Sequence, residues 1–283
     1  MLDGVRAACG DARPCQLRPL QLFLAWNGVL VLVYEGFPDS LAGIKGRLAP
    51  LYGRENFGSR WPKTTLAATS DTAPELVLPE LERLRTLCVA HSAGLPSEPV
   101  PVKGVEVVEY KWRSLEAEGA PQRAAIPLPG GGGANGGSSG SSVGEEERER
   151  VRSVLSEWDD TAAYLPLANK VGSRISSYRH ASPAGATLVT FLATSGGDQW
   201  ASILRQLRAF RESVDGAFPG RFAWLAEESL HCTLRALDTP ASPDPPAPAP
   251  ARTLACLPCL EMDRARAPIQ SWATRVSMWG CFL

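Results

Sequence analysis

The chain has 283 residues, with 29 Lys and Arg against 30 Asp and Glu and a hydrophobic fraction of 44%. Near-neutral charge argues against tight, sequence-independent binding to long nucleic acids, which requires a basic surface. It leaves room for a local basic pocket that holds a small phosphodiester or an RNA end. With 26 Gly and 24 Pro, a substantial part of the chain is expected to lack regular structure.

The N-terminal segment raises the question of a signal peptide. Residues 1–19 read as a loosely ordered leader, and an apolar run follows from Leu20 to Val33. No small-x-small cleavage site follows this run, and it is shorter than the ~20 residues that a membrane span needs. The alternation of Val and Leu over residues 29–33 favours a buried central strand. We therefore expect a cytoplasmic or nuclear protein with no membrane partner.

A first lobe is predicted over residues 20–125. Hydrophobic periodicity indicates strands at residues 29–35, 63–68 and 102–110, and helices at residues 40–51 and 79–91. The Gly- and Ser-rich residues 126–144 are typical of a linker.

A second lobe is predicted over residues 145–238. It has helices at residues 145–158 and 199–214 and strands at residues 188–192 and 231–237. Residues 174–180 mix basic and aromatic side chains, so they could line a nucleotide cleft or form a solvated loop. A complete lobe would continue with another helix and strand, but residues 239–283 are Pro-rich and of low order. Either the lobe is truncated or its missing strand comes from elsewhere in the chain.

Seven cysteines form no disulfide framework, because their number is odd and Cys88 and Cys232 fall in apolar periodic segments. Cys256 and Cys259 form a Cys-x-x-Cys that could bind zinc or cycle redox. A zinc site needs two further ligands, and only Cys281 is close in sequence. We expect neither a metal nor a cofactor.

The strand at residues 231–237 carries the most informative motif, His231-Cys232-Thr233-Leu234. Residues i and i+2 of a strand point to the same face, so His231 and Thr233 project together. An imidazole can move a proton while a neighbouring hydroxyl holds a phosphate oxygen. The alternative is a surface strand that carries one His and one Thr by chance.

A second segment has the same shape. Lys63-Thr64-Thr65-Leu66 also places a polar residue, a spacer, Thr and Leu in one strand. Each segment follows an apolar strand and a helix, so the pattern strand, helix, strand with polar-x-Thr-Leu occurs twice. This repetition indicates an internal duplication.

These two segments resemble the hallmark of the 2H phosphoesterase superfamily, which includes 2′-5′ RNA ligase-like proteins and cyclic nucleotide phosphodiesterases. The resemblance covers roughly residues 26–112 and 186–238. It implies an α+β fold with two pseudo-symmetric β-α-β lobes, whose antiparallel-rich sheets flank a central cleft. It also implies metal-independent hydrolysis of a cyclic phosphodiester at a nucleotide or RNA end. His231, Thr233, Lys63 and Thr65 would be the catalytic positions, and Arg235, Tyr34 and Trp61 would contact the substrate.

The chain departs from the family at Lys63, where the first motif has His. A lysine of ordinary pKa, near ~10.4, is charged at neutral pH and donates protons rather than accepting them. Lys63 could neutralise a phosphate or protonate a leaving group, or it could be a solvated lysine beside Trp61. An active enzyme and a catalytically inactive module that binds phosphate or RNA ends therefore both stay open. A protein that binds partners through its Pro-rich tail is a third alternative.

Overall fold

The computed structural model of the protein describes residues 1–52, 55, 57–119, 121–129, 142–170, 174–180 and 185–237. All of the described residues belong to one compact unit. The centre of the expected linker, residues 130–141, and the expected Pro-rich tail, from residue 239 onward, lie outside the described residues.

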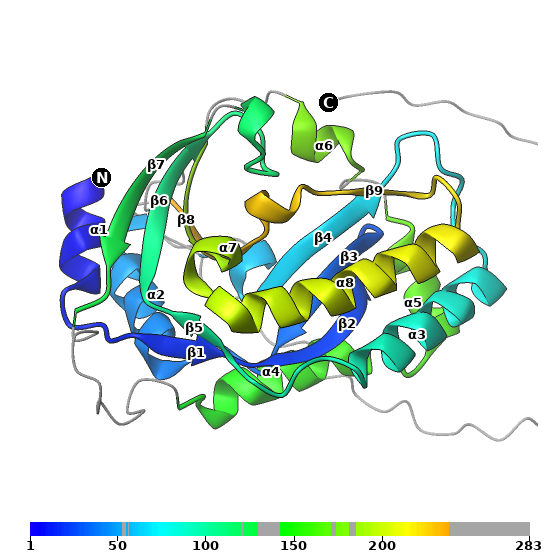
Figure 1. Ribbon diagram of the computed structural model, residues 1–283, viewed down its shortest axis with the longest axis horizontal. Coiled ribbons are helices and arrows are strands. Elements are labelled where there is room, and N and C mark those ends of the chain that lie inside the picture. The colour runs from blue at the N-terminus through cyan, green and yellow to red at the C-terminus, as the bar shows by residue number, and fades with distance from the viewer. Residues whose placement is uncertain are drawn as a thin grey trace, which may run out of the picture. The chain divides into compact units, whose positions relative to one another are not determined.

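Ten strands and eight α-helices are found in the described residues (Figure 1). The strands are β1 (Cys15–Leu17), β2 (Pro19–Ala25), β3 (Val29–Tyr34), β4 (Lys63–Thr69), β5 (Val100–Val102), β6 (Gly104–Tyr110), β7 (Gln122–Pro127), β8 (Gly185–Phe191), β9 (Phe222–Trp224) and β10 (His231–Ala236). The helices are α1 (Leu2–Cys9), α2 (Asp39–Tyr52), α3 (Leu78–Ser92), α4 (Glu145–Ser156), α5 (Thr161–Ala168), α6 (Ser176–Arg179), α7 (Leu192–Ser195) and α8 (Gly197–Ala217).

The fold is α+β, as the sequence predicts. Eight strands form one sheet in the order β2-β3-β4-β10-β8-β6-β7, with β9 paired to β4, and the described pairings are all antiparallel. Strands β1 and β5 form a small separate pair. The two strands that carry the motifs, β4 and β10, are neighbours at the centre of the large sheet.

The two halves of this sheet repeat one arrangement. On one side β3 leads through α2 to β4, and on the other β8 leads through α7 and α8 to β10. In each half the returning strand pairs antiparallel with the strand before the helix. Each motif strand also has a register shift directly after its threonine, at Leu66 in β4 and at Leu234 in β10. The matching irregularity supports the duplication independently of the sequence pattern.

The strand that the second lobe lacks in sequence is supplied from earlier in the chain. β6 follows the first motif in sequence, yet it pairs with β8 along five residues, and β7 pairs with β6. Of the two alternatives, a truncated lobe or a strand from elsewhere in the chain, the structure shows the second, because β6 and β7 cover the edge of β8. It also corrects the start of the expected linker, because residues 122–127 form β7.

Residues 1–19 are not a disordered leader. They form α1 and β1, and helix α1 buries Val5, Ala8 and Cys9 along one face. β1 pairs with β5, which fixes the end of the segment to the chain after α3. A helix of eight residues is too short to be stable alone, so these tertiary contacts account for its formation.

The apolar run at residues 20–33 contains two strands rather than one. Asn27 and Gly28 both have positive φ, of 65° and 71°, and connect β2 to β3 as a tight hairpin. Asn-Gly is the preferred sequence for such a turn, because both residues tolerate the left-handed conformation. β3 is buried along its whole length, as expected for a central strand.

Helices on both sides bury the first half of the sheet. Trp158 and Tyr164, which lie at the end of α4 and in α5, pack around Phe23 of β2, with ring centroids 4.5 and 5.9 Å from it. The Tyr164 hydroxyl donates to the Leu24 carbonyl at 2.8 Å. Helices α3 and α8 run side by side, joined by contacts from His91 (Figure 1).

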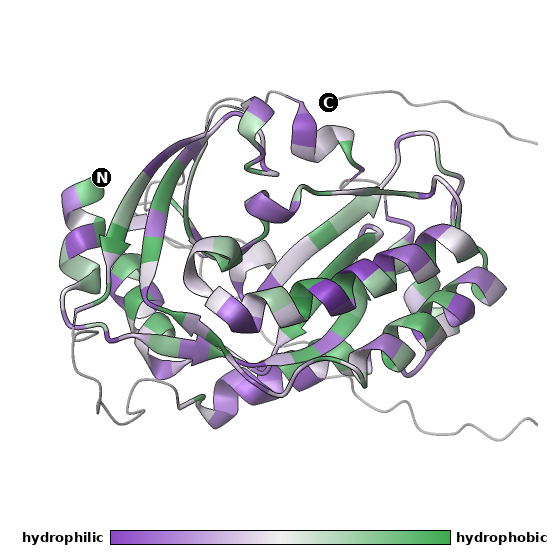
Figure 2. Cartoon of the chain, in the orientation of Figure 1, coloured by the Kyte–Doolittle hydropathy of each residue, from purple (hydrophilic) through white to green (hydrophobic). Residues whose placement is uncertain are grey.

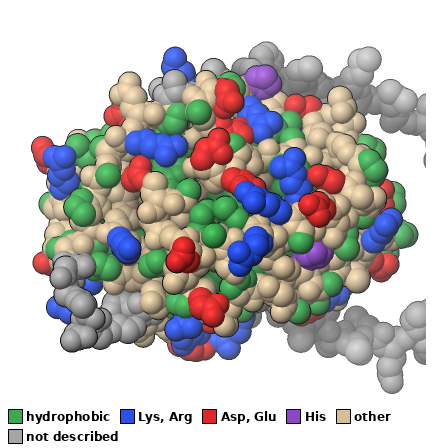
Figure 3. Space-filling view, in the orientation of Figure 1, with side chains coloured by type: hydrophobic (Ala, Val, Ile, Leu, Met, Phe, Trp, Pro, Cys, Tyr) green, Lys and Arg blue, Asp and Glu red, His purple; other side chains and the backbone are tan. Residues whose placement is uncertain are grey.

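The surface matches the overall charge balance. Figure 2 shows hydrophobic residues concentrated in the central strands and hydrophilic residues along the outer helices. On the face drawn in Figure 3, acidic and basic side chains are interspersed. Among the described helices, none combines the length and apolar character that a membrane crossing requires.

The pairing of β4 with β10 can be tested by cross-linking. Cys232 pairs with Thr64, so His231 lies opposite Thr65. Directly opposed residues of antiparallel strands have Cα atoms about 4.5–5.5 Å apart, which a disulfide can bridge. Thr65→Cys combined with His231→Cys should therefore form a disulfide under mild oxidation, detected as a linked peptide by mass spectrometry. Thr65→Cys with Ala236→Cys is the matched control, because its second site lies five residues, or roughly 16 Å, farther along β10. Equal cross-linking in both pairs would contradict this register.

Candidate functional site

The two motifs meet on one face of the sheet. Thr64 in β4 pairs with Cys232 in β10. Because strand side chains alternate between the two faces of a sheet, the neighbours of Thr64 and of Cys232 point to the face opposite these two residues. Lys63 then lies across from Thr233, and Thr65 lies across from His231. The four side chains form a quadrilateral, with the two threonines on one diagonal and Lys63 and His231 on the other. Diagonal neighbours in such a pair are roughly 7–8 Å apart, which a phosphate group can span.

These four side chains line a cavity of about 160 Å³. Its other lining residues come from six places: the loop before β4, β6 and the chain just after it, α6, β8, the chain just after β9, and β10. In that order they are Gly58 and Ser59, Tyr110 and Arg113, Tyr178, Thr187, Leu225, and Ala236. A second cavity of about 260 Å³ shares Gly58, Lys63, Thr65, Arg113 and Tyr178 with the first. It is otherwise lined mainly by apolar and aromatic side chains, namely Phe23, Ala25, Trp26, Asn27, Val29, Trp61 and Val154. The site is thus a polar cavity continuous with an aromatic one.

His231 is held as a neutral imidazole with one nitrogen available. Its Nδ1 lies 2.7 Å from the Ser229 carbonyl oxygen, which can only accept, so Nδ1 carries the hydrogen. In the neutral ring Nε2 is then an acceptor. Burial lowers the pKa of His231 to about 4, and the nearby Arg123 acts in the same direction. His231 is therefore neutral at pH 7, and its Nε2 lone pair can accept a hydrogen bond or a proton.

Lys63 has the complementary property. Its ammonium donates to the Gly58 carbonyl and lies 4.0 Å from the centroid of the Trp61 ring. Burial lowers the pKa of Lys63 to about 8, and the charge of Lys45 contributes in the same direction. An amine with this pKa is mostly protonated at pH 7 but can give up its proton readily.

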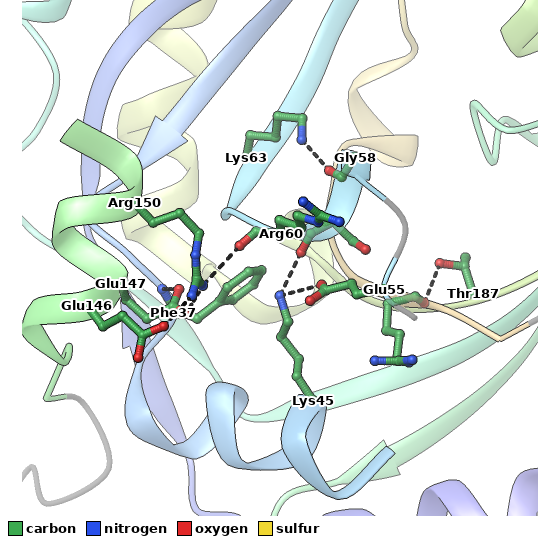
Figure 4. Close-up of polar contacts among 12 residues, drawn as sticks. Phe37, Lys45, Glu55, Gly58, Arg60, Lys63, Glu146, Glu147, Arg150 and Thr187 are labelled. Carbon is green, nitrogen blue, oxygen red and sulfur yellow. Dashed lines mark hydrogen bonds and ion pairs between the residues drawn. The ribbon is translucent and has the colours of Figure 1, made fainter. Parts of the chain in front are cut away.

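The loop before β4 is held by three cations (Figure 4). The successive carbonyls of residues 58–60 accept hydrogen bonds from Lys63, Lys45 and Arg150, respectively. Lys45 comes from α2 and Arg150 from α4, so two helices and β4 fix the same short segment. Because this segment supplies one wall of the cavity, its fixation positions the Lys63 side chain.

Lys45 is the buried member of this group. Only 8% of its side chain is exposed, and its ammonium lies 2.7 Å from a Glu55 carboxylate oxygen and 2.6 Å from the Ser59 carbonyl (Figure 4). The ammonium also lies 3.7 Å from the centroid of the Phe37 ring. Burial lowers the pKa of Lys45, while the Glu55 carboxylate opposes that shift.

An ion pair fixes the opposite wall. Glu116 accepts two hydrogen bonds from the Arg179 guanidinium, at 2.7 and 2.8 Å, and one from the Ala226 amide at 3.0 Å. Burial acts to raise the pKa of Glu116, but these hydrogen bonds outweigh it and hold the pKa below its ordinary value. The neighbouring Tyr178 carbonyl accepts from the Ser114 amide, so the segments that carry Arg113 and Tyr178 are held together.

Two residues expected to contact the substrate do not line either cavity. The Tyr34 side chain is fully buried on the opposite face of the sheet, where its hydroxyl lies 2.9 Å from Thr64 Oγ1. Arg235 is 2% exposed and follows the register shift at Leu234. That shift turns Arg235 to the opposite face and places Ala236 at the cavity. Trp61, the third expected contact, lines the aromatic cavity.

Several lining residues were not predicted as site residues. Arg113, Tyr110 and Thr187 come from segments read only as strands, and no local pattern marks them as functional. Tyr178 belongs to the basic and aromatic stretch 174–180, which the sequence predicts either to line a cleft or to form a solvated loop. Tyr178 lines both cavities, so the first interpretation holds for this residue.

Comparisons with known proteins give no further identification: no protein-family model, no curated protein and no solved structure matches the chain. Within the described part of the chain, no group of three or more His, Cys, Asp or Glu side chains is arranged to hold a metal ion. Cys256, Cys259 and Cys281 lie outside the described residues.

The buried Lys45–Glu55 pair yields a stability prediction. Lys45→Met leaves Glu55 without its cation and should lower the free energy of unfolding by about 3 kcal/mol, the cost of breaking a buried ion pair. Adding Glu55→Gln should recover part of this loss, because no unpaired charge is then left. Urea denaturation of the single and double variants measures both values. The exposed lysine variant Lys103→Met is the control and should change stability by less than about 0.5 kcal/mol. Equal effects of Lys45→Met and Lys103→Met would contradict the importance of the pair.

Proposed function

We propose that the protein is a 2H phosphoesterase-like hydrolase that opens a cyclic phosphodiester of a nucleotide or RNA end. The observation that carries the proposal is the quadrilateral of Lys63, Thr65, His231 and Thr233 in one cavity. Two hydroxyls on one diagonal can hold the non-bridging phosphate oxygens. Two proton-transfer groups on the other diagonal then flank the phosphorus on opposite sides, as an in-line displacement requires.

The pKa values of the two flanking groups support an assignment of their roles. His231, whose pKa is about 4, accepts a proton from the attacking water through Nε2. The water oxygen forms a bond to phosphorus while one ring ester bond breaks. Lys63, whose pKa is about 8, donates its proton to the departing ester oxygen. Thr65 and Thr233 donate to the phosphate oxygens, on which charge builds during the displacement.

The cavity electrostatics support an anionic substrate. Among the described residues that line the two cavities, basic side chains are present and no Asp or Glu is found. The adjoining aromatic cavity can accommodate a nucleobase attached to the phosphate. We place the protein in the cytoplasm or nucleus, which is supported by the unpaired state of Cys9, Cys15, Cys88 and Cys232.

His231→Ala gives the first test of the proposal. The variant should lose hydrolysis of a nucleoside 2′,3′-cyclic phosphate by roughly 100-fold or more, the usual contribution of a general base. Its thermal unfolding should stay close to that of the wild type, so the loss can be assigned to chemistry. His180→Ala, which changes an exposed histidine, is the control and should keep full activity. Equal turnover by His231→Ala and the wild type would remove His231 from the mechanism.

The assignment of acid and base predicts the pH dependence. The rate should rise as His231 loses its proton, through a pH of about 4, and fall as Lys63 loses its proton, through a pH of about 8. Lys63→His should keep hydrolysis but move the upper limb down toward the ordinary histidine pKa, near ~6.5. Lys63→Met should lower kcat by roughly 100-fold, because no proton donor is left. An upper limb that stays at its wild-type pH in Lys63→His would show that Lys63 is not the acid.

The second candidate function is a binding module that no longer catalyses hydrolysis. It is favoured by the Lys63 ammonium, which donates to the Gly58 carbonyl and so is committed to a protein acceptor. Under this alternative the cavity still binds nucleoside phosphates, but wild type, Lys63→His and Lys63→Met all show no turnover. Parallel binding and hydrolysis assays on these three proteins separate the two candidates.

A further inference from the structure

Lys63 stands where the polar and the aromatic cavities join. Its side chain lines both, together with Thr65, Arg113 and Tyr178. Thr233 lines only the polar cavity and Trp61 only the aromatic one, with the Trp61 ring centroid 4.0 Å from the ammonium. A ligand that fills both cavities therefore meets the Lys63 side chain where they join.

The surroundings of this nitrogen lower its affinity for a proton, so a neutral amine is present beside the ammonium form. Its hydrogen-bond acceptor is the uncharged Gly58 carbonyl, and no carboxylate is found among the described residues that line the two cavities. The nearby carboxylate of Glu55 already pairs with Lys45 at 2.7 Å. Burial lowers the pKa of Lys63 to about 8, so a sizeable fraction is neutral near physiological pH. A desolvated lysine of this kind is a nucleophile toward carbonyl compounds.

We propose that Lys63 is a covalent capture site that forms an imine with aromatic aldehydes carrying a phosphate group. The phosphate lies between Thr65 and Thr233, the ring lies in the aromatic cavity, and the aldehyde carbon meets the Lys63 nitrogen at the junction. The hydroxyl pair, the aromatic cavity and the Lys63 amine together define the ligand class.

The reaction balances without a further reagent. The neutral Lys63 amine adds its lone pair to the aldehyde carbon, and the carbonyl electron pair moves to oxygen, which takes up a proton. The resulting carbinolamine loses water as the nitrogen lone pair forms the C=N bond. Water can accept the proton that leaves nitrogen and deliver one to the departing hydroxyl. One amine and one aldehyde give one imine and one water, with no change in oxidation state.

Pyridoxal 5′-phosphate is the probe for the test. Pyridoxal lacks the phosphate, and its free hydroxyl also closes on the aldehyde as a hemiacetal, so the two reagents are compared through their labelling of Lys63 relative to Lys103. The full-length protein is incubated with each, the imine is reduced with borohydride, and labelled peptides are quantified by mass spectrometry. We expect Lys63 to react at least about 10-fold faster than the exposed Lys103 and Lys111, because more of it is neutral at pH 7.5. The preference for pyridoxal 5′-phosphate over pyridoxal should be larger at Lys63 than at Lys103, and inorganic phosphate should slow the labelling of Lys63.

Two outcomes overturn the proposal: Lys63 labelled no faster than Lys103, or labelled with the same preference between the two aldehydes as Lys103 and with no effect of inorganic phosphate. Thr65→Val with Thr233→Val should remove the preference for the phosphorylated aldehyde while leaving reaction with pyridoxal. If that double variant does not fold, phosphate competition on the wild type gives the same answer.

The capture chemistry uses the same hydroxyls as the proposed function but needs no hydrolysis. Selective labelling in a protein that hydrolyses no cyclic phosphate supports capture and contradicts the hydrolase. Hydrolysis without selective labelling supports the hydrolase and contradicts covalent capture at Lys63.

Discussion

The antiparallel contact between β4 and β10, centred on Thr64 and Cys232, is the constraint on which the rest of the site depends. It joins the two repeated halves of the sheet, and its register alone places two threonines on one diagonal and Lys63 and His231 on the other. A shift of either strand by one residue would turn its two site side chains into the core, because strand side chains alternate with a period of two. The core on the opposite face, which includes Tyr34 and Cys232, opposes such a shift.

The structure also shows how a lysine is accommodated at the position where the 2H phosphoesterase motif, which the sequence resembles, has histidine. The cation is held at a carbonyl of a loop that Lys45 and Arg150 fix from two helices. Burial and the neighbouring Lys45 charge lower the pKa of Lys63, so its acidity approaches the range useful near neutral pH. The substitution therefore changes the pH range of the site without removing a proton donor from it. The same lowered pKa makes the amine a nucleophile, which links the proposed hydrolysis to the proposed imine chemistry.

Periodicity and the polar-x-Thr-Leu pattern predicted the main strands and helices and the repeated strand–helix–strand units, and the family resemblance implied the α+β class with both motifs at one site. Other features depend on contacts between residues distant in sequence. The alternation in β6 does not reveal that its partner is β8, which lies about 80 residues later. Arg235 follows the motif pattern, but the register shift at Leu234 turns it away from the cavity. Arg113 and Tyr178 reach the site because Glu116 pairs with Arg179, a contact between two loops that no local pattern records.

The central claim is that β4 and β10 together hold a phosphate group, and a crystal structure of the full chain soaked in inorganic phosphate tests it most directly. The account predicts an anion whose oxygens lie roughly 2.5–3.0 Å from both the Thr65 and Thr233 hydroxyls, with Lys63 and His231 on opposite sides of it. Phosphate bound only at exposed arginines, or touching Lys63 but neither threonine, would contradict the claim.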